Sequence, residues 1–300
     1  MVYKVGSRGP VVKQIQEELK LPVDGIFGKA TESLVVSYQR EHHLVADGLV
    51  GNSTLDHMGI LDTDLKVANH FTTENGLKII TRHMPSGEYI EGDNGAPILN
   101  DFAFLHHTSG WNNPNACIDQ WARDDRGRIA TEFVLGGQNI KNGDDEHDGV
   151  IVQAFPEGCQ GWHLGKTGSR YMDRHSVGIE ICNFGYLTDT GKTYVGTQAA
   201  ESQIVTLAEA FQGHTKWHKY SDEQIKALGK WITYVAARDN IDIREGLQKW
   251  IEEQGPTKAF GFQQDAYLGN VKGLLTHTNV RKDKTDCFPQ QELVDMLLSL

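Results

Sequence analysis

Two histidines and a late acidic segment could together bind a divalent metal. His106 lies at the end of the apolar segment FAFLHHT (102–108), His277 ends GLLTH (273–277), and KTDC (284–287) follows a few residues later. Neutral imidazole, carboxylate and thiolate are the usual zinc ligands, and catalytic zinc sites use three of them and leave a position open. The sequence therefore predicts a metal centre formed by two strand ends and a loop.

A glutamate inside an apolar strand is the second chemical feature. Glu180 lies in SVGIEIC (176–182), where a buried and unpaired carboxylate would be unfavourable. A functional role accounts for its position, and a structural ion pair is the alternative. His107 points to the opposite face of its strand from His106, because side chains alternate along a strand. We therefore expect His107 to be packed or hydrogen-bonded and not to bind metal.

Short β-branched and aromatic runs bounded by Gly, Asn and Asp predict the strands that carry these residues. A helix is predicted from Ser221, which forms a capping box with Gln224, and weaker helical patterns cover 243–253 and 289–300. Strands with interspersed helices favour an α/β domain whose sheet is buried between helices. The predicted strands are 77–84, 101–107, 128–135, 149–155, 176–182 and 273–277.

The first sixty residues contain an internal repeat. The segment DGIFGKAT (24–31) returns as DGLVGNST (47–54), with an offset of 23 residues. An amphipathic helical pattern precedes each turn, and Asp-Gly supplies turn conformations that residues with a Cβ resist. The sequence therefore predicts a small all-α domain at 1–60, a linker at 61–75 and a larger domain at 76–300.

Composition excludes several classes of function. The formal net charge of −11 argues against nucleic acid as a partner, because binding to phosphates needs a basic surface. No apolar run reaches the roughly 18 residues of a membrane helix, and the start MVYKVGSRGP lacks the apolar core of a signal peptide. We therefore expect a protein that is made in a host cytoplasm without a signal peptide and has no membrane partner. We also expect a monomer, and we expect the four cysteines to be free thiols.

Residues 3–58 resemble the peptidoglycan-binding module of many cell-wall hydrolases. The resemblance lies in G-S-R-G-x-x-V-x-x-I-Q and the doubled DG-x-x-G-x-x-T. It implies that a glycan or a stem peptide docks in a shallow groove between the two repeats.

Residues from about 75 to 300 resemble the zinc N-acetylmuramoyl-L-alanine amidases. The motifs FLHHT, GWHLG, SVGIEICN and LLTH-x₆-KTD occur in the order found in that superfamily, which includes phage lysozymes of amidase type and peptidoglycan recognition proteins. The resemblance implies a mixed β-sheet flanked by helices. It also implies peptidoglycan as the substrate, the same polymer that the N-terminal module is expected to bind.

The resemblance also implies roles for individual residues. His106 and His277 correspond to two zinc ligands, and the position two after the motif lysine makes Asp286 the third. Cys287 is an alternative, because related enzymes can use cysteine. In those enzymes we expect Cys-Pro-Gly, whereas this chain has Cys-Phe-Pro at 287–289.

Four further residues take part in the implied site. Glu180 corresponds to the general base, and Lys284 to the lysine that stabilises the oxyanion. His163, in GWHLG, and the neighbouring Trp162 are expected to bind substrate. Some relatives use a tyrosine in place of the glutamate, but ATEFVL (130–135) contains none.

The implied function is hydrolysis of the amide between N-acetylmuramic acid and L-alanine of bacterial peptidoglycan, with Zn²⁺ as cofactor. The combination of module and amidase favours a phage endolysin that acts on the cell wall, with a bacterial autolysin or exported effector as alternatives. A recognition protein without catalysis is the alternative function. A glycosidase is disfavoured because it would need paired carboxylates.

Overall fold

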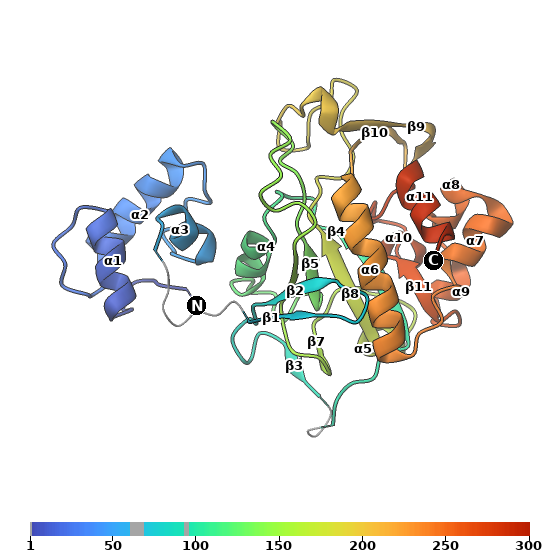
Figure 1. Cartoon of the computed structure of the whole chain (residues 1–300), viewed down its shortest axis with the longest axis horizontal. Coiled ribbons are helices and arrows are strands. Elements are labelled where there is room, and N and C mark those ends of the chain that lie inside the picture. The colour runs from blue at the N-terminus through green and yellow to red at the C-terminus, as the bar shows by residue number, and fades with distance from the viewer. Residues whose placement is uncertain (1, 61–68, 93–95) are drawn as a thin grey trace. The chain divides into compact units, whose positions relative to one another are not determined.

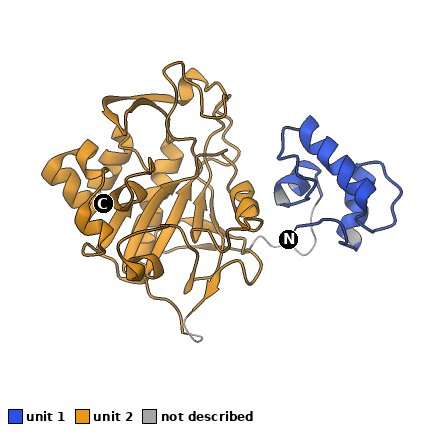
Figure 2. Cartoon of the chain, turned by 180° about the vertical axis from the view of Figure 1, so that it is seen from behind, with its two compact units in different colours: residues 1–69 blue, residues 70–300 orange. Residues whose placement is uncertain are grey.

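The computed structural model describes residues 2–60, 69–92 and 96–300. These residues divide into two compact units, Met1–Asn69 and His70–Leu300, which Figure 2 shows in different colours. Residues 61–68 of the predicted linker lie outside the described residues, and strand β1 (Asn69–Thr72) lies within the remaining part of that linker. The predicted domain boundaries stay a prediction.

The first unit is helical, as the repeat predicts. Helices α1 (Pro10–Glu18), α2 (Lys29–Glu41) and α3 (Asn52–His57) surround one small core. Both repeats contribute buried side chains to this core, which is why neither copy is expected to fold alone. Its fully or almost fully buried members include Val12, Ile15, Phe27, Val35, Val50 and Leu55.

A buried glutamine explains the repeated Asp-Gly motif. The Gln16 side chain accepts a hydrogen bond from the backbone N–H of Gly25 (2.8 Å) and donates one to Asp24 Oδ1 (2.7 Å). Gln39 makes the same two bonds to the Asp-Gly pair at 47–48, at 2.9 and 3.2 Å. Both glycines have φ near +73° (72° and 74°), a region that residues with a Cβ rarely adopt. The motif therefore fixes the turn after each helix.

The second unit is built on a mixed sheet. Within the described residues, seven strands pair in the order β1, β2, β6, β5, β8, β4, β11 (Figure 1). The strands after β1 in this sheet are β2 (Lys78–Thr81), β4 (Phe102–His107), β5 (Phe133–Leu135), β6 (Ile151–Gln153), β8 (Ser176–Ile181) and β11 (Gly273–Thr276). Two further pairs lie outside it, β3 (Ile90–Glu91) with β7 (Cys159–Gln160) and β9 (Ile204–Phe211) with β10 (His214–His218).

Helices cover both faces of the sheet, which confirms the predicted α/β class. The long helix α6 (Asp222–Asp239) begins at the predicted Ser221–Gln224 capping box and crosses one face (Figure 1). Helices α7 (Leu247–Gln254) and α11 (Gln291–Leu298) contribute to the same core. The opposite face packs against α4 (Pro114–Trp121) and α5 (Arg170–Arg174). The remaining short helices are α8 (Pro256–Ala259), α9 (Gln264–Tyr267) and α10 (His277–Val280).

Strand register places the candidate residues at one end of the sheet. Strand β4 runs parallel to both β8 and β11. His106 is paired with Glu180 on β8, and Leu105 is paired with Thr276, the last residue of β11. Because these parallel strands end together, His106, Glu180 and His277 converge. No helix among the described residues has the length and apolar character that crossing a membrane requires.

Candidate metal centre

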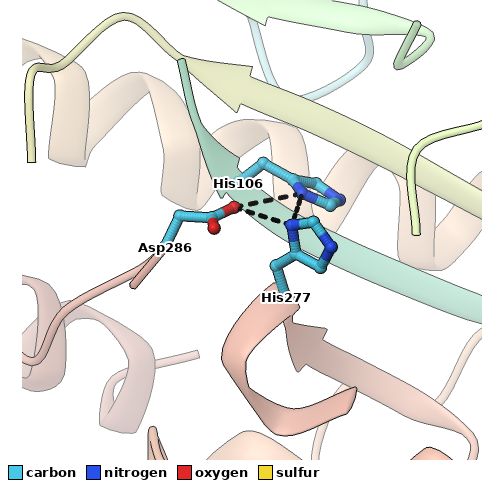
Figure 3. A group of neighbouring side chains, drawn as sticks. All are labelled: His106, His277 and Asp286. Carbon is cyan, nitrogen blue, oxygen red and sulfur yellow. Dashed lines mark hydrogen bonds and ion pairs between the residues drawn. The ribbon is translucent and has the colours of Figure 1, made fainter. Parts of the chain in front are cut away.

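His106, His277 and Asp286 form a compact cluster (Figure 3). The Nδ1 atoms of the two histidines lie 3.1 Å apart. Asp286 Oδ2 lies 3.2 Å from the first of these atoms and 3.1 Å from the second. Three potential ligand atoms therefore form a nearly equilateral triangle, and such a group could hold a metal ion.

Each member of the cluster is positioned by a different element. His106 comes from β4, and His277 begins α10 directly after β11. Thr276 caps that helix through a capping box with Asn279. Asp286 lies in the following loop, which is joined to α10 because the Asp286 carbonyl accepts a hydrogen bond from the N–H of Thr278 (3.0 Å).

Burial determines the charge state of the cluster. The three side chains belong to residues that are 1%, 6% and 7% exposed. Burial, with a smaller contribution from nearby His277, lowers the pKa of His106 to about 4. Burial alone would raise the pKa of Asp286, but the neighbouring His277 and His106 side chains lower it well below its usual value. The cluster therefore offers a neutral imidazole and a carboxylate, both suited to a cation.

The outer nitrogens of both histidines are also hydrogen-bonded. His106 Nε2 lies 2.9 Å from His163 Nδ1, and His163 Nε2 lies 2.9 Å from the hydroxyl of Ser176. His277 Nε2 donates to the carbonyl oxygen of Leu164 at 3.2 Å. The GWHLG segment therefore contacts both histidines, on the side of their Nε2 atoms.

Glu180 lies beside the cluster without a partner for one of its oxygens. Its Oε2 atom is buried and has no hydrogen-bond partner among the described residues. Burial raises the pKa of Glu180 well above its usual value, and the Asp286 carboxylate raises it further, while Lys284 lowers it. Lys284 is half-buried, so its charge is felt at the carboxyl group. This arrangement suits a group that takes up and releases a proton.

The other predicted residues lie elsewhere. The Cys287 thiol is buried in the core between the sheet and α6 and is hydrogen-bonded to Tyr220. His107 points to the same side, with its Nδ1 atom 3.1 Å from the Tyr220 hydroxyl. Trp162 is half-buried, and its backbone N–H donates to the carbonyl of Arg128 (2.8 Å). Of the two residues expected to bind substrate, the structure brings His163 into contact with the cluster.

Two contacting groups were missed by sequence reasoning, the Leu164 carbonyl and Ser176. The role of a backbone carbonyl cannot be predicted from the amino-acid type, because every residue has one. Ser176 did leave a signal, because Ser176, Gly178 and Glu180 alternate along β8 and must share one face. A Cβ on Gly178 would lie 3.1 Å from the His163 ring, so this face is shaped around that histidine.

The solved structures that match this chain match only part of it. A fused Zn-dependent amidase/peptidase/peptidoglycan-binding domain-containing protein from Clostridium acetobutylicum ATCC 824 is 34% identical over 23% of this chain and 34% of its own, with a TM-score of 0.20. A mutant endolysin from Bacillus subtilis is 17% identical over 64% of this chain and 97% of its own, with a TM-score of 0.33. The chain thus spans about a third of the length of the Clostridium protein.

The amidase AmiD from E. coli, in complex with anhydro-N-acetylmuramic acid-L-Ala-D-gamma-Glu-L-Lys, is 17% identical over 52% of this chain and 55% of its own, with a TM-score of 0.31. No curated protein sequence matches the chain.

Two protein families match consecutive parts of the sequence. A peptidoglycan binding domain family matches residues 8–58. The family described as N-acetylmuramoyl-L-alanine amidase matches residues 94–287, more than half of the chain, and this range contains every residue of the cluster. The chain therefore belongs to the N-acetylmuramoyl-L-alanine amidase family and carries a peptidoglycan-binding domain ahead of its amidase domain.

Proposed function

We propose that the chain is a zinc-dependent hydrolase that cleaves the amide between N-acetylmuramic acid and L-alanine in peptidoglycan. The observation that supports this most strongly is the triangle of His106 Nδ1, His277 Nδ1 and Asp286 Oδ2, with sides of 3.1 to 3.2 Å. Two imidazoles and one carboxylate are a usual ligand set of catalytic zinc. We propose Asp286, and not Cys287, as the third ligand.

The spacing of the three atoms fits zinc. Tetrahedral bonds of about 2.0–2.1 Å place ligand atoms about 3.3 Å apart, close to the separations in this cluster. Without a cation, two imidazole nitrogens at 3.1 Å can share at most one proton, and a metal would satisfy both lone pairs. Zinc held there would polarise the amide carbonyl and lower the pKa of a water molecule towards about 7.

Two residues beside the centre account for the movement of protons and charge. Glu180 would accept a proton from the attacking water and return it to the departing amine of L-alanine. Its raised pKa favours the second of these transfers, because a weakly acidic carboxyl group holds the proton until the amine needs it. Lys284 would stabilise the negative charge that develops on the carbonyl oxygen.

The N-terminal unit would keep the enzyme on its insoluble substrate. Its family match to a peptidoglycan binding domain supports binding to the same polymer. Attachment raises the local concentration of the amidase domain without changing the chemical step. We propose that the two units act together in lysis of the bacterial cell wall, as an endolysin does.

Digestion of purified peptidoglycan tests this function. The full chain should release stem peptides with a free L-alanine amine and leave glycan strands with free lactyl carboxylates, both identified by mass spectrometry. A chelator should abolish the release, and added zinc should restore it. The Glu180→Gln variant, prepared in parallel, controls for contaminating hydrolases. Release of reducing sugars instead, or binding without any cleavage, would contradict the proposal.

A further inference from the structure

We propose that the dipeptide His163-Leu164 positions both ligand histidines, so that the zinc affinity of the centre depends on it. This inference rests on the metal centre proposed above, and it gives His163 a positioning role in place of substrate binding. The two residues are adjacent in sequence. They contact histidines that are 171 residues apart along the chain, one through a side chain and the other through a backbone carbonyl.

The Leu164 carbonyl determines the tautomer of His277. A carbonyl oxygen can only accept a hydrogen bond, so the bond at 3.2 Å places the proton of a neutral His277 on Nε2. The Nδ1 atom then carries the lone pair that faces His106 and Asp286. This contact therefore prepares His277 for metal binding before any metal arrives.

His163 supports His106 through a chain of two hydrogen bonds. If His106 binds metal through Nδ1, its Nε2 must carry the proton and donate it to His163 Nδ1 (2.9 Å). His163 must then donate through Nε2 to the Ser176 hydroxyl (2.9 Å). Each donor from His106 through His163 to Ser176 then has an acceptor. This series of hydrogen bonds is therefore complete when His106 Nδ1 carries no proton.

The dipeptide is itself held firmly. The Leu164 side chain is fully buried in a cluster with Phe102, Phe104 and Met172. The Leu164 backbone N–H faces the Asp173 carboxyl group and lowers its pKa against the effect of burial. Because the side chain and the N–H are both fixed, the carbonyl has little freedom to turn away from His277.

The sheet provides the space for the His163 ring. Gly178 lies between Ser176 and Glu180 on the same face of β8, and a Cβ there would lie 3.1 Å from the His163 ring. The Phe104 ring meets the His163 ring edge to face, with 5.8 Å between centroids. A ring enclosed on these sides is suited to hold a neighbour in place, and less suited to follow a moving substrate.

Zinc affinity measured on full-length variants tests the proposal. His163→Leu should weaken zinc binding about 10- to 100-fold, the usual effect of removing a hydrogen-bond partner of a metal ligand, measured by competition with a chromogenic chelator. His163→Asn should recover much of the affinity, because its Oδ1 can occupy the place of Nδ1 and accept from His106. Ser176→Ala should have a smaller effect in the same direction.

A matched control and a second readout separate this role from simple misfolding. His83 is an exposed histidine of the same unit, hydrogen-bonded to Gln153 (3.5 Å), and His83→Leu should leave zinc affinity unchanged. Long-range ¹H–¹⁵N NMR on the unsubstituted zinc-loaded protein should show His163 protonated on Nε2 and not on Nδ1.

Two results would overturn the proposal. One is a folded His163→Leu variant with unchanged zinc affinity and reduced turnover, which would return His163 to substrate binding. The other is an Nδ1-protonated His163 in the loaded protein. Failure of the unsubstituted chain to bind zinc at all would instead refute the proposed function, so the two failures are distinguishable.

Discussion

Two buried polar clusters of the amidase domain have opposite hydrogen-bond balance. Near the start of β5, both oxygens of Glu132 accept from Arg238, at 2.7 and 3.0 Å, and Gln153 donates a third bond at 2.9 Å. At the end of β4, His106, His277 and Asp286 offer more lone pairs than protons. Glu180 beside them has a buried oxygen without a partner among the described residues.

This difference separates a structural role from a chemical one. The Arg238 guanidinium supplies a cation and fixed donors, so Glu132 holds the end of α6 to the sheet and its charge is already neutralised. The cluster at β4 keeps lone pairs free, and the proposed function assigns them to a cation. The four predictions below test this contrast, from the largest expected effect to the smallest.

Removing the proposed third ligand should have the largest effect. Asp286→Ala should lose bound zinc and at least about 10³-fold in turnover, because a catalytic metal contributes several kcal/mol to the transition state. Cys287→Ser should keep both, since the thiol lies in the core beside Tyr220. Zinc content by elemental analysis and turnover on peptidoglycan measure the two variants. Zinc loss in the cysteine variant alone would reassign the ligand.

Glu180→Gln should separate chemistry from metal binding. The amide keeps the size of the side chain but cannot accept the proton, so turnover should fall about 10²- to 10⁴-fold while zinc content stays unchanged. The measurement pairs turnover with elemental analysis on the same preparation. A parallel loss of zinc would instead make Glu180 a ligand or a structural support.

Arg238→Met should damage stability and spare the centre. The substitution leaves Glu132 buried without its cation, so the free energy of unfolding should fall by about 3–5 kcal/mol, while zinc content is retained. The exposed pair of Arg244 and Asp242 provides the control, because Arg244→Met should leave the free energy of unfolding almost unchanged. Denaturant unfolding measures both. Equal effects of the two substitutions would show that the Glu132 cluster is not structural.

Asp173 is intermediate between the fully paired Glu132 and Glu180, which has one unpartnered oxygen among the described residues. Its titration should have the smallest of the four effects, a change in stability with pH. Burial raises its pKa to about 6, although the Leu164 N–H opposes the shift. The folded state therefore binds a proton more tightly than the unfolded state, and stability should fall as pH rises from about 4 to about 6.

Asp173→Asn resembles the protonated form and should remove this dependence. At pH 7.5 the variant should be more stable than the unsubstituted chain by about 1 kcal/mol, after allowance for solvent screening, or about 2–4 °C in Tm. At pH 4 the two should melt together. Thermal melts at both pH values provide the measurement, and a constant difference would show that the carboxyl does not titrate as described.

Much of the fold could be predicted because it depends on local patterns. Each of the six predicted strands contains an observed strand, several of them shorter than predicted, and the structure contains the Ser221–Gln224 cap and the Asp-Gly turns. The α/β class follows from their order. The pairing of Glu132 with Arg238 could not be predicted, because 106 residues separate them and no local pattern links their types.

The candidate site divides in the same way. The sequence predicts that two strand-end histidines can meet at one edge of a sheet. The parallel pairing of β4 with β11, which brings His106 to His277, is a finding of the structure. The choice between Asp286 and Cys287 depends on how an irregular loop turns after α10, which residue spacing does not determine. The place of His163 depends on a loop that packs across β4 and β8, and only the alternation of Ser176, Gly178 and Glu180 hints at it.

Anomalous diffraction at the zinc edge, from crystals of the full chain grown with zinc, tests the central claim most directly. The account predicts one strong peak bonded to His106 Nδ1, His277 Nδ1 and Asp286 Oδ2, with a fourth position open towards Glu180. A peak on the Cys287 sulfur, or no peak within reach of the two histidines, would contradict it.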